Sequence, residues 1–303
     1  MSTRTIYQRA LKKSQRVLLK WRRAIFPLLP QRELFPSDVI LHFGYHRCLT
    51  VYYEGIFSRL SKEFNFSFQN FFALHSYTGF EQAVVSGMGK RVVGLDNVSD
   101  INFAKFPGYK GSHFVRDPRD LIVSGYHYHL WTDEPRIIGK GTDPKRIDWE
   151  PIIRHPYFLQ YVENERNKFP NNISYQEYLK SLDVERGLIL EILWWQSIFE
   201  QMQKWQLNPL IIELKFEEIV GNEVEAFRKV FDHYEFHPKL KQRGLEIVDE
   251  LSIKNQPSGE RKHIRSGKPA QWKVEFTPLM KEVFRNLYGN LLIQFGYEQG
   301  NDW

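Results

Sequence analysis

Short apolar runs, three of which lead into a helical pattern, constrain the fold of this 303-residue chain more than any other feature. Runs of this length that are rich in β-branched and aromatic residues indicate buried strands. We expect strands over residues 37–43, 91–95, 111–115 and 210–214. Strands that alternate with helices form a largely parallel sheet covered on both faces. The sequence therefore predicts an α/β fold, a three-layer sandwich around a central, mostly parallel sheet.

The remaining chain is assigned to the same domain, because the composition never changes sharply between residues 37 and 303. Helices are expected over about 175–195 and 223–234, and an irregular insertion over 131–172, rich in Pro, Gly, His and aromatic residues. Irregular segments near a site often carry substrate specificity.

Composition excludes several classes of protein. Hydrophobic residues make up 42% of the chain and aromatic residues 15%, so the chain is globular and not disordered. Cys48 is the single cysteine, which excludes an internal disulfide framework and a thiolate metal cluster and favours a reducing compartment. The apolar runs are too short for a membrane span, and the N-terminus lacks a signal-peptide core. We therefore expect a cytoplasmic protein.

The first 36 residues form a separate feature, a basic amphipathic helical extension. The net charge of the chain is +6, and no acidic residue precedes Glu33. At helical spacing the apolar residues gather on one side and most basic residues on the other. The helix either packs on its own domain, which we favour, or touches anionic lipid as a peripheral membrane contact. Nucleic acid is not an expected partner, because few aromatic residues interleave with the basic ones.

The segment Gly44–Tyr52 joins the first strand to the first helix, as phosphate-binding loops do. A nucleotide P-loop reads G-x-x-x-x-G-K-[ST], but here Leu49, Thr50 and Val51 replace its glycine, lysine and magnesium-binding hydroxyl residue. The loop thus lacks the magnesium ligand, which argues against ATP or GTP hydrolysis. Arg47 supplies positive charge, and the helix start from about Cys48 to Tyr52 supplies amides. An ordinary strand-to-helix turn remains an open alternative for this segment alone.

Two further segments carry anion-binding residues. Arg116 and Ser124 are eight residues apart, which places the arginine at a strand end and the serine on the next helix, where both can hold one phosphate. Residues 265–277 begin with Arg265, Ser266, Gly267 and Lys268 and contain Trp272. Such a basic, glycine-containing loop can surround a phosphate, with the tryptophan as a core anchor.

Together these three segments resemble sulfotransferases that use 3′-phosphoadenosine 5′-phosphosulfate (PAPS). The first is similar to the 5′-phosphosulfate loop G-x-[PH]-[KR]-[SC]-G-T-T, with matches at His46, Arg47, Cys48 and Thr50 and departures at Leu49 and Val51. The second resembles the 3′-phosphate motif R-[DN]-P-x-D-x-x-[VL]-S, and the third the C-terminal R-K-G-x-x-G-x-W-K-x-x-F-T. A weaker match, residues 215–219, has Phe216 in place of a tyrosine. The matches run in order over about 38–298.

The resemblance implies a donor site and roles for its residues. Asp120 would brace the turn of the second motif, and Tyr52 would lie against adenine. The residues implied in donor binding are Arg47, Cys48, Leu49, Thr50, Val51, Tyr52, Arg116, Ser124, Arg265, Ser266, Gly267 and Lys268. The resemblance also implies that 37–303 is one sulfotransferase domain and that the reaction needs no metal.

The reaction implied is direct transfer of a sulfuryl group, with Arg47 stabilising the leaving group. Two residues are candidates for the base that accepts the proton of the acceptor, because the strand over 91–95 is not followed by the histidine of many cytosolic members. Asp96 is the first candidate and Glu54 the second, although a cap or a surface carboxylate explains each as well. His127 and His129 are candidates for lining the acceptor entrance, whereas His113 is expected in the core.

The acceptor itself is left open by the sequence, and so is the oligomeric state. A small molecule, a lipid or a carbohydrate with a hydroxyl or amine would fit the aromatic insertion. Two alternatives to a sulfotransferase also stay open at this point, a P-loop kinase-like protein and a nucleotide-binding pseudo-enzyme. The departures at Leu49 and Val51 and the absent histidine support the second alternative.

Overall fold

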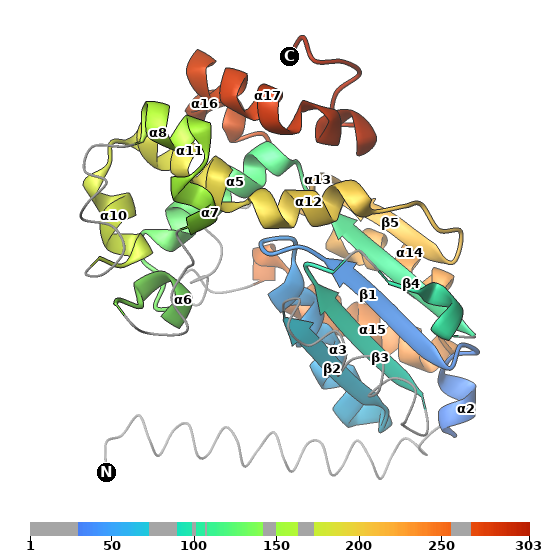
Figure 1. Ribbon diagram of the computed structural model, residues 1–303. Helices are drawn as coiled ribbons and strands as arrows, with labels where there is room; N and C mark the ends of the chain where they lie inside the picture. Colours follow the sequence, from blue (N-terminus) through green and yellow to red (C-terminus); the bar gives the residue numbers. More distant parts are fainter. Residues whose placement is uncertain are drawn as a thin grey trace, which may run out of the picture.

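A five-stranded parallel sheet is the centre of the computed structural model, which describes residues 30–72, 90–98, 101–106, 108–141, 150–162, 173–255 and 268–303 (Figure 1). The strand order is β2-β3-β1-β4-β5, and every pairing is parallel. The predicted α/β fold around a central sheet is confirmed. The strands are β1 (Val39–Gly44), β2 (Ser67–Phe72), β3 (Arg91–Asp96), β4 (Tyr109–Val115) and β5 (Ile211–Lys215).

Strand β2 is the strand that the sequence analysis missed. It lies at the edge of the sheet and pairs only with β3 among the described strands. Ser67 and Gln69 are exposed on it, so its sequence lacks the continuous apolar run that marks the central strands. The other four strands agree with their predicted ranges to within two residues.

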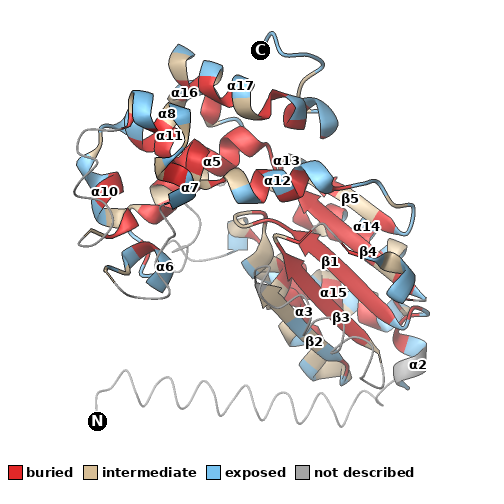
Figure 2. Ribbon diagram, in the orientation of Figure 1, coloured by how far each residue is buried: buried red, intermediate tan, exposed pale blue. Residues whose placement is uncertain are grey.

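Helices cover both faces of the sheet, and the side chains of β1 alternate between the two cores that result. Val39, Leu41 and Phe43 pack into one core with residues of α5, α11, α12 and α17, whereas Ile40 packs into the other with α3, α14 and α15. Because β1 is central, both of its faces are buried, and its sequence is apolar except for the buried His42 (Figure 2). These helices are α3 (Thr50–Phe64), α5 (Pro118–His129), α11 (Val184–Trp194), α12 (Gln196–Lys204), α14 (Glu223–His233), α15 (Pro238–Leu251) and α17 (Pro278–Gln294).

The helix predicted over 175–195 is wrong as a single helix, because the structure has two. α10 (Tyr175–Ser181) ends before Leu182, whose backbone is extended, and α11 starts at Val184. Asp183 starts the second helix, since its side chain accepts a hydrogen bond from the amide of Arg186 at 2.9 Å. The predicted helix over 223–234 is confirmed by α14.

The predicted irregular insertion over 131–172 contains short helices in its described parts, and residues 142–149 and 163–172 of it lie outside the described residues. Most of the predicted N-terminal extension, residues 1–29, also lies outside, so its membrane contact stays a prediction. The short helices of the structure are α2 (Gln31–Leu34), α6 (Pro135–Ile138), α7 (Glu150–Ile153), α8 (Pro156–Tyr161), α13 (Phe216–Ile219), α16 (Trp272–Glu275), η2 (Phe103–Lys105) and η3 (Ile253–Asn255).

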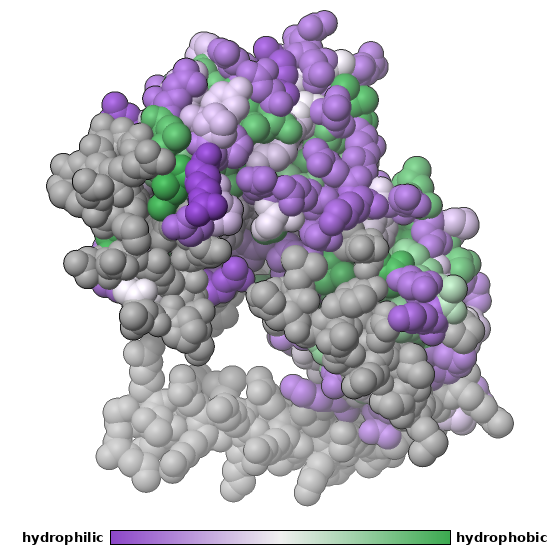
Figure 3. Space-filling model, in the orientation of Figure 1, coloured by the Kyte–Doolittle hydropathy of each residue, from purple (hydrophilic) through white to green (hydrophobic). Residues whose placement is uncertain are grey.

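The surface gives little sign of an apolar interface on the face drawn in Figure 3. Its described part over the C-terminal helices is mainly hydrophilic, and hydrophobic side chains form small, separate areas. Within the described ranges, no helix combines the length and the apolar character that crossing a membrane requires. The predicted cytoplasmic location stays a prediction.

Candidate active site at the carboxyl edge of the sheet

The carboxyl ends of β1, β3 and β4 lie next to one another at one edge of the sheet. Gly44 at the end of β1 pairs with Asp96 at the end of β3, and β4 runs along the other side of β1. β1 is thus the position at which the strand order reverses direction. In open α/β sheets, ligands bind outside the carboxyl ends of the strands at such a position. The loop after β1, Asp96 and Arg116 all belong to this edge.

The loop after β1 is held in a defined shape by backbone contacts. The side chain of Asn97 accepts a hydrogen bond from the amide of His46 at 2.9 Å, and the amide of Asn97 donates to the carbonyl of Gly44 at 2.8 Å. Arg47 and Leu49 adopt left-handed backbone angles, with φ of 68° and 64°. The related pattern has glycine at the position of Leu49, so leucine occupies the conformation that glycine favours, at a cost of about 1 kcal/mol.

The N-terminus of α3 follows this loop and has no side-chain cap. The first-turn amides of Thr50, Val51 and Tyr52 are therefore not used by a side-chain cap, and their predicted binding of an anion stays a prediction. Cys48 is an exception to that prediction, because its amide donates to the carbonyl of Tyr45 at 2.9 Å and its side chain is fully buried. Burial raises the pKa of the Cys48 thiol far above its usual range, so the group stays protonated and serves packing.

Arg47 and Ser124 are brought together, although 77 residues separate them in the chain. The Nε of Arg47 donates to the Oγ of Ser124 at 3.1 Å, and the guanidinium lies 4.4 Å from the centre of the Tyr128 ring. Burial and the neighbouring Arg116 lower the pKa of Arg47 to about 10. The side chain therefore remains cationic near neutral pH while it is poorly hydrated, which strengthens its pull on an anion.

Arg116 lies beside the same loop. Its Nη1 donates to the carbonyl of Arg47 at 3.2 Å, and its guanidinium covers the Phe216 ring at 4.1 Å. Arg116 is only 4% exposed, and its Nε has no hydrogen-bond partner among the described residues. A buried N–H that lacks a partner is costly, and a phosphate oxygen would satisfy it. Phe216 thus supports Arg116 with its ring face where a tyrosine stands in the related pattern.

Of the two predicted base candidates, the structure places only Asp96 against the loop. The hydroxyl of Thr50 donates to Asp96 Oδ1 at 3.1 Å. Burial raises the pKa of Asp96 to about 7, a value suited to proton transfer near neutral pH. Glu54 lies one turn further along α3, half-buried, and makes no hydrogen bond or ion pair with the residues described.

The C-terminal segment is tied to α5 by Asp120. Its carboxylate accepts hydrogen bonds from the amides of Ala270 at 2.6 Å and Trp272 at 3.0 Å. Ala270 adopts a left-handed φ of 60°, which explains why the related pattern has glycine there. Asp120 thus braces this segment rather than its own turn. Lys268, which belongs to the same segment, is exposed, whereas Arg265, Ser266 and Gly267 lie outside the described residues.

Arg119 links the second and third motifs through a buried contact that the sequence did not indicate. It pairs with Asp117 through two nitrogens at 2.9 and 2.7 Å and with Glu298 at 2.6 Å, and it stacks on Trp272 at 3.6 Å. The side chain is 2% exposed. The predicted anchoring role of Trp272 therefore depends on a buried cation.

Arg119→Ala is expected to lower the free energy of unfolding by about 3 kcal/mol, because the change leaves the buried Asp117 carboxylate without its partner. Urea denaturation followed by tryptophan fluorescence measures the loss. Arg154→Ala, which removes an exposed ion pair with Glu150, is the matched control and should change stability by less than about 0.5 kcal/mol. Equal effects of the two variants would contradict the anchoring role of Arg119.

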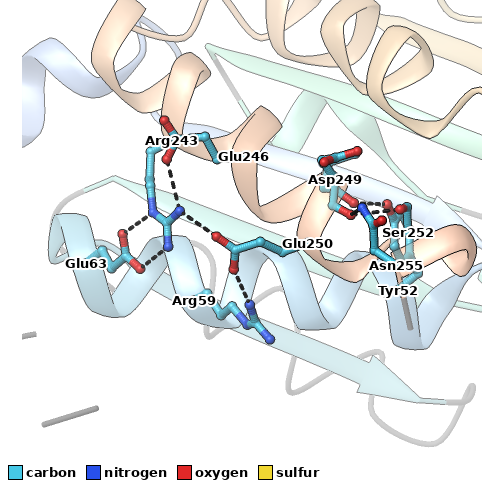
Figure 4. A network of polar contacts seen from close by, with 10 residues as sticks. Tyr52, Arg59, Glu63, Arg243, Glu246, Asp249, Glu250, Ser252 and Asn255 are labelled. Atoms are coloured by element: carbon cyan, nitrogen blue, oxygen red, sulfur yellow. Dashed lines mark hydrogen bonds and ion pairs between the residues drawn. The ribbon is translucent and has the colours of Figure 1, made fainter. Parts of the chain in front are cut away.

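A polar network joins α3 to α15, the helix that leads toward the third motif (Figure 4). Arg243 pairs with Glu63 through two bonds of 2.7 and 3.0 Å and also contacts Glu246 and Glu250. Nearby, the Tyr52 hydroxyl donates to the carbonyl of Val248 at 2.7 Å. Tyr52 thus helps to hold the two helices together, and its predicted contact with adenine stays a prediction.

The two histidines predicted at the acceptor entrance have different surroundings. His129 is fully buried, so the prediction that it lines an open entrance is wrong; α5 turns it toward α11. His127 contacts Glu275 of α16 at 2.8 Å, and its place at an acceptor entrance stays a prediction. His113 is fully buried in the core, as expected. The described residues contain no cluster of three or more His, Cys, Asp or Glu side chains suited to a metal ion.

Comparison with known proteins decides the family. The model of the sulfotransferase domain matches residues 110–296, which is more than half of the chain. The chain belongs to the sulfotransferase family. The matched range contains the second and third motifs and begins after the loop at residues 44–52. No curated protein matches the chain.

Solved structures that are similar to this sulfotransferase include a mouse sulfotransferase complexed with PAP (adenosine 3′,5′-bisphosphate). It is 15% identical to this chain, and the match covers 86% of this chain and 89% of that chain, with a TM-score of 0.45. A complex of retinol dehydratase with retinol and PAP is 12% identical over 84% and 81% of the two chains, with a TM-score of 0.44. A complex of retinol dehydratase with androsterone and PAP is 12% identical over 86% and 83%, with a TM-score of 0.43. The assignment depends on the family match, and the kinase-like and pseudo-enzyme alternatives are not favoured.

The sequence analysis assigned no role to two residues beside the site. Tyr128 covers Arg47 and donates to Glu134 at 2.6 Å. Glu217 accepts hydrogen bonds from the amide of Asp117 at 3.0 Å and from the Tyr297 hydroxyl at 3.0 Å. The spacing of Tyr128 from Ser124, one helical turn, was a usable signal, because both lie on one face of α5. Glu217 lies within the weaker family match over 215–219, but no role was assigned to it there.

Proposed function

We propose that this sulfotransferase takes a sulfuryl group from PAPS and transfers it to a hydroxyl or amine of a small-molecule, lipid or carbohydrate acceptor. The observation that carries the proposal is the meeting of Arg47, Arg116 and Ser124 beside an uncapped helix N-terminus. Two guanidinium groups and free amides suit a ligand with two separate phosphates. The loop also lacks the lysine and the magnesium-binding hydroxyl residue of a nucleotide P-loop, which supports PAPS over ATP.

In this proposal, different residues bind the donor, stabilise its leaving group and accept the proton of the acceptor. When bound, the donor supplies an activated sulfuryl group whose leaving group is adenosine 3′,5′-bisphosphate (PAP). Arg47 carries the charge that stabilises the anion left on that group, and Arg116 with Ser124 holds the 3′-phosphate. Asp96 accepts the proton from the attacking hydroxyl, while the Thr50 hydroxyl orients its carboxylate. Arg265, Ser266, Gly267 and Lys268 are proposed to contribute to donor binding.

Arg116→Ala tests the donor site directly. We expect the change to weaken binding of PAP about 10- to 100-fold, because it removes charged hydrogen bonds to a phosphate. Isothermal titration calorimetry with PAP measures this, and Arg228→Ala, which changes an exposed arginine of α14, is the matched control. Unchanged affinity in a folded Arg116→Ala variant would refute the proposed 3′-phosphate site.

The choice of donor and the transfer itself need separate measurements on the unchanged protein. Calorimetry with ATP in place of PAP should give much weaker binding, and added magnesium should not strengthen it. Radiolabelled PAPS with a panel of phenols, aliphatic alcohols, amines, glycolipids and oligosaccharides then identifies the acceptor class. Tighter binding of magnesium ATP than of PAP would overturn the proposed donor.

A further inference from the structure

Helix α5 presents two neighbouring rows of side chains to two different partners. Ser124 and Tyr128, four residues apart, face Arg47 of the donor loop. Gly125 and His129, again four residues apart and each one position later, face α11. Residues four apart lie on the same side of a helix, so the two rows are adjacent. A rotation of α5 that changed the second row would therefore move the first row relative to Arg47.

The second row meets a fully buried carboxylate, Glu191 of α11. Its Oε1 accepts hydrogen bonds from His129 Nδ1 at 2.7 Å and from the Tyr175 hydroxyl at 2.8 Å, and its Oε2 accepts one from Trp195 Nε1 at 3.0 Å. The three donors come from α5, from α10 and from the junction of α11 with α12. Burying a carboxylate is costly unless such donors satisfy it, so the cluster has one favourable arrangement.

The helices approach so closely that this arrangement also fixes their separation. A Cβ atom at Gly125 would lie 2.8 Å from Trp195 Nε1 and 3.1 Å from Glu191 Oε2, which only glycine avoids. The donor loop contacts the same cluster. The His46 ring lies 5.7 Å from that of Tyr128, 5.9 Å from Trp195 and 6.4 Å from His129, between centroids. The loop and α5 thus share one buried support.

We propose that Glu191, together with His129, is a positioning pair that sets the rotation of α5 and so aligns Ser124 and Tyr128 with Arg47. The pair acts through α5 and does not touch the donor. This inference rests on the proposed PAPS site, because Ser124 must bind the 3′-phosphate for the alignment to matter. Loss of the pair should therefore weaken the binding of PAP, and the size of this effect should depend on whether Ser124 is present.

A double-mutant cycle with PAP as the probe tests this dependence. Glu191→Gln keeps the shape of the side chain and removes its charge, and we expect about 10-fold weaker PAP binding, as for residues that orient a binding group. Ser124→Ala alone should cost about 10-fold. If Glu191 acts through Ser124, the double variant loses about 10- to 20-fold, whereas independent effects would multiply to about 100-fold.

The chain offers a control in a second histidine–glutamate contact, between Nδ1 of the buried His113 and Oε2 of the half-buried Glu213 at 2.9 Å. Glu213→Gln should leave PAP affinity within about 2-fold of the wild type. If Glu191→Gln does not fold, as judged by its thermal melt, His129→Phe takes its place in the cycle, because an aromatic ring is kept at this position while the donor to Glu191 is lost.

The outcomes separate the inference from the function on which it rests. Wild-type protein that does not bind PAP would reject the proposed function itself. Wild-type binding with multiplicative effects of Glu191→Gln and Ser124→Ala would reject the positioning pair alone, as would unchanged affinity in Glu191→Gln. An unaltered affinity in Ser124→Ala would remove Ser124 from the donor site and this inference with it. If the double variant binds PAP at most about 20-fold more weakly than the wild type, the result supports the positioning pair.

Discussion

Replacing Arg47 with alanine is expected to lower the rate of sulfuryl transfer about 100- to 1,000-fold. Enzymes lose about this much activity when one hydrogen-bond donor to a developing anion is removed. Arg47 is the charged side chain of the loop after β1, and its pKa of about 10 keeps it cationic near neutral pH. Its bonds to Ser124 and its contact with Tyr128 hold the guanidinium in place. Steady-state turnover with PAPS and an identified acceptor measures the effect.

Arg47→Lys is the matched control for this prediction. Lysine keeps the positive charge but lacks the planar group that bonds Ser124 and stacks on Tyr128. We expect a loss much smaller than that of the alanine variant, and both variants should melt at similar temperatures. A turnover of Arg47→Ala within about 3-fold of wild type would show that this charge does not stabilise the leaving group.

Asp96→Asn is expected to lower turnover about 100- to 10,000-fold, the range that general-base catalysis contributes. The pH profile gives the more specific test. With a pKa of about 7, Asp96 becomes an ionised base as the pH rises through 7, so wild-type turnover should increase over that interval. Asparagine does not titrate, and the increase should disappear. Glu54→Gln is the matched control and should keep it. The reverse result would make Glu54 the base.

The raised pKa of Asp96 also predicts how the stability of the folded protein depends on pH. Because the folded state holds the Asp96 carboxyl protonated up to about pH 7, this group favours folding below the pKa of the unfolded chain, near 4. That contribution is lost as the pH rises from about 4 through 7. The melting temperature of Asp96→Asn should therefore fall less over this interval than that of the wild type. Parallel profiles for the two proteins would show that the Asp96 pKa is not raised.

Local patterns predicted the parts of the structure that depend on neighbouring residues. The central strands were found because both of their faces are buried, so most of their residues are apolar. β2 was missed because an edge strand exposes alternate residues. The helix over 175–195 was drawn too long because helical periodicity continues across the cap at Asp183. The helix cap at Asp183 thus divides a stretch that the hydrophobic pattern marks as one helix.

The three segments proposed to bind the donor also show which features a local pattern predicts and which depend on tertiary contacts. The identities and order of Arg47, Arg116 and Ser124 were sufficient to suggest one anion site, and the fold brings these three residues together. The direction of individual side chains was not predictable. His129 was expected at an entrance but points to a buried glutamate, because its direction depends on how α5 packs against α11. Arg119 looked like a variable position of a motif and is a buried link to Trp272.

The sequence by itself determined the parallel α/β fold, the strand-to-helix loop that lacks the magnesium residue of a P-loop, and the chain segments that supply the proposed anion-binding groups. Those features depend on hydrophobic periodicity and on residue types at fixed spacing, which act over a few residues. Only the tertiary structure decided which carboxylate lies at the loop, that His129 is buried and which arginine anchors the C-terminal segment. These depend on contacts between residues far apart in the chain, where burial and charge pairing act only after the helices have packed.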